Sequence, residues 1–119
     1  MRESHYWLLF QIAAVILFVF LGMHLVMMHL DDILHFFGVD MGDATSWSSV
    51  MQRAGSSSWL AIYIIFLALA LYHGFYGLRV ILIELPLPHF AIRTINWAIP
   101  LIGVAVFAYG IYIPINAYL

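Results

Sequence analysis

Three long apolar stretches, separated by two polar intervals, dominate the chain. Each is about 20 residues or longer, the length that carries an α-helix across the hydrocarbon core of a bilayer. The predicted membrane-spanning helices cover about residues 7–30, 58–83 and 94–117. No run alternates in the manner of a β-strand. The pattern therefore predicts a single all-α integral membrane domain over residues 1–119, with three transmembrane helices.

The longest polar interval, residues 31–57, is predicted to be an outer loop. Its first part, ending at Gly38, is read either as a continuation of the first helix or as an interfacial helix. Residues 47–52 are a second candidate for a short surface helix. An N-terminal signal peptide is the alternative to the first span, but the apolar run is long and lacks a small-residue cleavage site.

Prolines and glycines shape the end of the chain. Pro86 and Pro88 stop the second helix, and Pro100 and Pro114 are expected to kink or interrupt the third. Gly103 and Gly110 lie two turns apart on one face, which predicts close packing on a neighbouring helix. The apolar faces of the second and third helices are too extensive for a monomer, so we expect a larger heteromeric bundle.

Composition supports the membrane class. The chain is 66% hydrophobic and 8% charged, with a mean hydropathy of +1.03. The net charge is −2 and no basic run is present, so nothing indicates a nucleic-acid-binding surface. The chain has no cysteine, which excludes disulfides, zinc–thiolate sites and iron–sulfur ligation. Any redox centre that it holds must use His, Met or carboxylate ligands.

The positive charges predict an orientation. Arg2, Arg79 and Arg93 fall on the side of the N-terminus and the second loop, whereas Arg53 lies in the long loop among four aspartates. Cytoplasmic segments carry the excess of Lys and Arg. We therefore expect a multi-pass protein of the cytoplasmic (inner) membrane, with the N-terminus cytoplasmic and the C-terminus outside.

His73 is the main candidate for chemistry, because an imidazole at membrane depth is a functional hypothesis by default. Gly77, Val80 and Glu84 lie within about 40° of the His73 direction on a helix. A glycine one turn after the histidine leaves bare backbone beside the ring, which suits a flat ligand such as a porphyrin. The alternative is a histidine that bonds to a neighbouring helix, and spacing alone favours neither.

The run His73-Gly74-x-x-Gly77-Leu78-Arg79, with Glu84 five positions later, resembles the second helix of succinate dehydrogenase membrane-anchor subunits. That resemblance implies that His73 is an axial haem b ligand and that Glu84 lies near a quinone pocket. In many members a tyrosine follows the acidic residue, but here Leu85 does. A complete quinone site therefore cannot be assigned to this chain.

The first helix, from Tyr6-Trp7 through Gly22-Met23-His24-Leu25, is similar to the D-type anchor of actinobacterial and archaeal succinate:quinone oxidoreductases. In two-haem members this position serves the outer haem, which implies that His24 is a second axial ligand. His24 and His73 should lie very roughly 10–15 Å apart in depth. One haem cannot use both, so a histidine from another chain would complete each site. His29 is the second choice for this ligand, because it lies about 140° away from His24 around the helix.

Other polar residues are weighed by position. Tyr72, Tyr76 and Arg79 form a stripe offset from His73, and Arg79 is a candidate partner for a haem propionate. Arg79 could equally reach the interface or neutralise Glu84. Several remaining residues are read as interfacial, solvated or packing side chains rather than ligands: His5, His35, His89, Met23, Met27, Met28, Asp31 and Asp32.

The resemblance implies a haem b-binding anchor of complex II that passes electrons to quinone. Its implied partners are a C-type anchor, an iron–sulfur subunit and an FAD-containing flavoprotein, so this chain would do no dicarboxylate chemistry. One alternative is the anchor of a quinol:fumarate reductase or of another quinone-linked cytochrome b dehydrogenase. Another is a haem-free structural or transporter subunit in which His73, Arg79 and Glu84 form a buried polar network.

Overall fold

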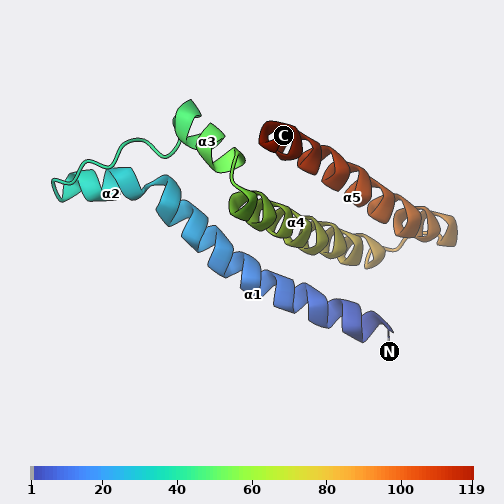
Figure 1. Cartoon of the computed structure of the whole chain (residues 1–119). Helices are drawn as coiled ribbons and strands as arrows, with labels where there is room; N and C mark the ends of the chain where they lie inside the picture. Colours follow the sequence, from blue (N-terminus) through green and yellow to red (C-terminus); the bar gives the residue numbers. More distant parts are fainter. Residues whose placement is uncertain (1) are drawn as a thin grey trace.

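The computed structural model describes residues 2–119, and for Arg2 the backbone alone. Met1 and the Arg2 side chain, whose charge entered the orientation argument, lie outside the described part. Three long and two short helices make up the fold (Figure 1): α1 (Arg2–Met28), α2 (Leu30–Phe36), α3 (Trp47–Ala54), α4 (Ser57–Ile83) and α5 (His89–Tyr118). The three long helices are long and apolar enough to cross a membrane. The predicted all-α, three-span architecture is confirmed.

The long helices extend beyond the apolar runs from which they were predicted. Helix α1 begins at Arg2 rather than near residue 7, and α5 begins at His89 rather than near residue 94. The N-cap of α5 is Pro88, whose ψ of 158° is extended, so the helix starts directly after it. The charge of Arg93 suggested a loop, but Arg93 lies in the second turn of α5, where a charged side chain can reach the membrane interface.

Helix α5 is continuous from residue 89 to 118, with Pro100 and Pro114 inside it. Of the two predicted effects, a kink or an interruption, the interruption is absent from this described helix, as transmembrane helices tolerate proline.

The two short elements between α1 and α4 are also helical. Gly38, with φ of +81°, follows the end of α2, where glycine adopts left-handed geometry without steric penalty. Ser46 caps α3 by accepting a hydrogen bond from the Ser49 amide at 3.4 Å.

Helix α4 lies between α1 and α5 and packs against both (Figure 1). This arrangement encloses almost nothing: among the described residues only Ala13 and Ile99 are buried, at 2% and 9% exposure. Large apolar side chains such as Phe18, which is 81% exposed, face outward. Lipid or partner helices must cover these faces, because an isolated chain has no internal core to bury them in.

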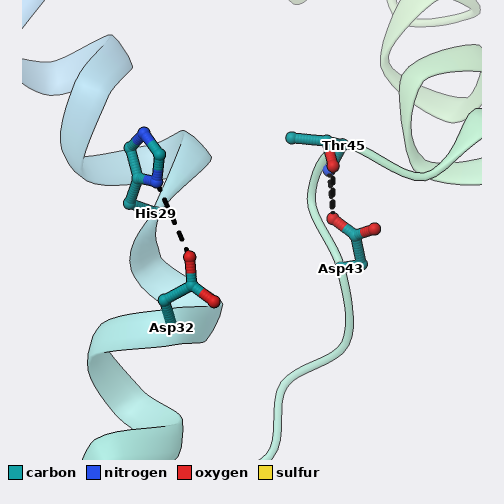
Figure 2. Close-up of polar contacts among 4 residues, drawn as sticks. All are labelled: His29, Asp32, Asp43 and Thr45. Atoms are coloured by element: carbon teal, nitrogen blue, oxygen red, sulfur yellow. Dashed lines mark hydrogen bonds and ion pairs between the residues drawn. The ribbon is translucent and has the colours of Figure 1, made fainter.

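The loop end of the bundle is held by local polar contacts. Arg53 on α3 donates to the Ala44 carbonyl at 2.7 Å. The Thr45 amide and hydroxyl both donate to Asp43 Oδ1, at 2.8 and 2.6 Å (Figure 2). These two hydrogen bonds to the charged carboxylate lower the pKa of Asp43. The contacts order a loop turn between α2 and α3 outside the predicted membrane-spanning segments.

The two glycines of α5 lie against α4, as the sequence predicts. A Cβ at Gly103 would lie 3.6 Å from the Phe75 ring, and one at Gly110 would lie 2.7 Å from Leu67 Cδ2. The distance at Gly103 is an ordinary van der Waals contact, whereas at Gly110 the Leu67 side chain would have to move to admit a Cβ.

Replacing Gly110 with leucine should force the two helices apart and lower the free energy of unfolding by about 1–3 kcal/mol. Thermal unfolding of the purified assembly measures this change. The matched control is Gly22→Leu, because a Cβ at Gly22 meets nothing within 4 Å. Equal melting temperatures for the two variants would contradict the close α4–α5 contact.

Candidate functional site

The half-buried ring of His73 is held against α1 by two contacts. Its Nδ1 lies 3.3 Å from the Phe10 carbonyl oxygen, and its ring stacks on the Phe10 ring with centroids 4.2 Å apart and an interplanar angle of 2°. A carbonyl can only accept, so Nδ1 must carry the proton in this contact. In the tautomer with its proton on Nδ1, the lone pair is at Nε2. This is the usual arrangement of a metal-binding histidine, with one nitrogen held by a backbone carbonyl and the other available.

Gly77 also lies in the contact between α1 and α4, next to Phe10. A Cβ at this position would lie 3.2 Å from Phe10 Cε2, which is closer than a side chain tolerates without a shift. From the sequence, we expected a flat ligand to occupy the space beside Gly77. In the structure the Phe10 ring lies beside Gly77 instead. Gly77 thus allows the ring that stacks on His73 to approach the α4 backbone. Phe10 was not predicted as a site residue, because an isolated phenylalanine in an apolar helix carries no distinguishing signal.

His24 lies well apart from His73. Its exposed side chain is on α1, with its ring centroid 6.4 Å from that of Phe66. Phe66 precedes His73 by seven positions on α4, about 10 Å at 1.5 Å per residue, so the two histidines lie at different depths. His29 lies beyond the end of α1, where its Nδ1 is 3.6 Å from Asp32 Oδ2 (Figure 2).

Arg79 joins all three long helices at one end of the bundle. Its Nε donates to Asn96 Oδ1 on α5 at 2.8 Å, and a terminal nitrogen lies 3.5 Å from Glu3 Oε1 on α1. Tyr76 lies one turn before Arg79 on α4. Glu3 and Asn96 were missed by sequence reasoning. The available signal was their position: both are polar residues near the ends of apolar helices, at the same end as Arg79.

The tyrosines extend this polar group along α4. The rings of Tyr72 and Tyr76 stack with centroids 5.7 Å apart. The Tyr72 hydroxyl donates to the Tyr6 carbonyl on α1 at 2.8 Å. The predicted Tyr72, Tyr76 and Arg79 stripe is therefore a set of interhelical contacts on the side of α4 that meets both α1 and α5.

Glu84 is not part of this group. It is the exposed C-cap residue of α4. Within the described chain, the Arg79 ion pair is with Glu3 and not with Glu84. His73, Arg79 and Glu84 thus do not form one polar network. No group of three or more His, Cys, Asp or Glu side chains within residues 2–119 could hold a metal ion.

A hollow of about 560 Å³ opens between α1 and α5 over α4, and we call it the trough. Its polar end is formed by Glu3, Tyr72, Tyr76, Arg79 and Asn96. The remaining wall is almost entirely apolar and includes Ala68, Leu71, Phe75, Ile99, Val104 and Phe107. The trough is an amphiphilic surface, and His73 is not among its lining residues.

Comparison with known proteins gives one relative. A protein described as a succinate dehydrogenase hydrophobic membrane anchor subunit, from Thermoplasma acidophilum, is 32% identical over 99 residues. The aligned region covers 83% of this chain and 74% of that protein. No protein-family model matches the chain, and no solved structure matches it.

Proposed function

The chain belongs to the family of succinate dehydrogenase hydrophobic membrane anchor subunits, and from this premise we propose that it holds haem b and anchors a complex II. It is a multi-pass membrane protein with three spans. Its partners are the flavoprotein and iron–sulfur subunits, which contain the FAD and the clusters, and a second anchor of the C type. Quinone is the electron acceptor.

The observation that carries the haem proposal is the contact between His73 Nδ1 and the Phe10 carbonyl, at 3.3 Å. With Nδ1 donating in this contact, Nε2 would be able to bind iron, while stacking on Phe10 holds the plane of the ring. The residues present therefore fit an axial imidazole. When bound, haem b supplies a one-electron redox centre within the membrane.

His24 is the proposed ligand of a second haem at the depth of Phe66. Its exposed imidazole is free to meet a group held by another subunit. The depth difference of about 10 Å prevents His24 and His73 from sharing one ring. Each haem would then need a further ligand from another chain, and the second anchor is the proposed source.

Arg79 and Tyr76 are proposed to hold the acidic edge of the haem near His73. Arg79 is six positions beyond His73, about 9 Å further along α4. A guanidinium has five N–H donors, so Arg79 can contact Asn96 and still donate to a propionate. A charge at this position would also raise the haem potential, because it favours the reduced state.

Glu84 is proposed to border a quinone pocket that partner subunits complete. It lies at the exposed end of α4, on the same side of the membrane as Arg79. Positive charge at this side makes it cytoplasmic, with the N-terminus, and the soluble subunits dock there. The same haem ligands and quinone pocket would serve a quinol:fumarate reductase.

Deletion of this chain tests the anchoring role. We expect succinate oxidation, assayed with a water-soluble electron acceptor, to move from the membrane fraction to the soluble fraction of a cell extract. Re-expression of the chain should return the activity to the membrane. Activity that remains membrane-bound after deletion would contradict the proposal, because another subunit would then be sufficient for attachment.

A further inference from the structure

The trough offers one end to a polar head and the rest to a hydrocarbon tail. We propose that it binds the tail of one zwitterionic phospholipid, with the lipid head at Glu3 and Arg79. Neither His73 nor His24 lines this site. Its polar end includes Arg79 and Tyr76, which the proposed function also places at the haem edge, so the lipid head would lie beside that edge. The inference needs only the membrane position of the chain.

The dimensions of the trough accommodate a hydrocarbon tail. From Ala68 to Arg79 the trough follows eleven residues of α4, about 16 Å. That length is about half the thickness of the hydrocarbon core of a bilayer, so the trough matches the tail of a lipid in one leaflet. Its volume is about 560 Å³.

The charges at the polar end select the head group. One cation and one anion, Arg79 and Glu3, lie 3.5 Å apart there, with side chains 20% and 70% exposed. This distance exceeds that of a strong charge-assisted hydrogen bond, and Arg79 retains N–H donors beyond the one given to Asn96. A phosphate can accept from Arg79 while an ammonium group donates to Glu3. A quinone head would provide no cation for Glu3.

The depth of the polar end agrees with a lipid head. Glu3 lies just before Tyr6 and Trp7, and such aromatic residues mark the membrane–water interface. The apolar wall runs from this level toward the membrane centre, ending near Phe107 and Ala68. A phospholipid in the adjoining leaflet can therefore enter sideways without changing depth.

The test counts lipids bound to the complex purified through a tag on this chain. The complex is exchanged into nanodiscs of equimolar phosphatidylethanolamine and phosphatidylglycerol, returned to detergent, washed, and analysed by mass spectrometry for both lipids and for quinone. We expect about one phosphatidylethanolamine per copy of the wild-type chain. Val104→Trp, which fills the trough, should reduce retention about tenfold. Val106→Trp on the same helix, outside the trough lining, is the matched control and should retain the lipid.

Glu3→Gln tests recognition of the head. We expect the ratio of retained phosphatidylethanolamine to phosphatidylglycerol to fall about tenfold, the effect of one lost charge-assisted hydrogen bond. Equal retention by Val104→Trp and wild type, an unchanged ratio in Glu3→Gln, or quinone bound in place of phospholipid would each overturn the proposal. If Val104→Trp does not assemble, Ala68→Phe fills the same trough from α4. Haem content, measured on the same samples, reports separately on the proposed function.

Discussion

Replacing His73 with alanine should remove one b haem per copy of the chain. The variant deletes Nε2, the proposed iron ligand, and the remaining contacts of α4 offer no substitute imidazole at that depth. The measurement is a dithionite-reduced minus oxidised spectrum of the purified complex, with pyridine-haemochrome quantitation. His89→Ala is the control, since His89 is exposed at the start of α5.

A second variant at this position separates ligation from helix packing. His73→Gln keeps an N–H donor for the Phe10 carbonyl, which the imidazole contacts at 3.3 Å, but offers no imidazole nitrogen to iron. We expect it to assemble with near wild-type thermal stability and to lack the haem. Full haem in both His73 variants would show that His73 is an interhelical contact only.

Replacing His24 with alanine should remove a different haem and leave the His73-dependent one in place. The two histidines lie about 10 Å apart in depth, so each loss is independent. The same spectra, recorded during a redox titration, should show one of two potentials disappear. His29→Ala, five residues further along, is the control because His29 faces Asp32. A single haem that survives His24→Ala would make His24 structural and leave one haem per chain.

Sequence patterns were sufficient to predict the three spans and their order. Runs of apolar residues as long as 58–83 leave few alternatives, and the observed α4, Ser57–Ile83, agrees with that range. The short helices were left open, because seven or eight residues give too few turns for a clear period. Their ends were nevertheless marked: Gly38 follows α2, and Ser46 caps α3.

The candidate site was less predictable, because its contacts join helices that are distant in sequence. The His73 and Gly77 pair was visible as a spacing on one helix, but the stacking of Phe10 depends on the register between α1 and α4. Glu84 was the nearest acidic residue to Arg79 in sequence. The fold instead brings Glu3 to it, since the N-terminus of α1 lies beside the end of α4 (Figure 1).

Between residues 3 and 119 only Ala13 and Ile99 are buried, and this affects how the cell maintains the protein. A chain without its own core gains most of its folding free energy from association, so its stability depends on the concentration of its partners. Copies made in excess should be short-lived substrates for membrane proteases rather than a stored reserve. The abundance of the anchor would then follow synthesis of the scarcest subunit, and not transcription of its own gene.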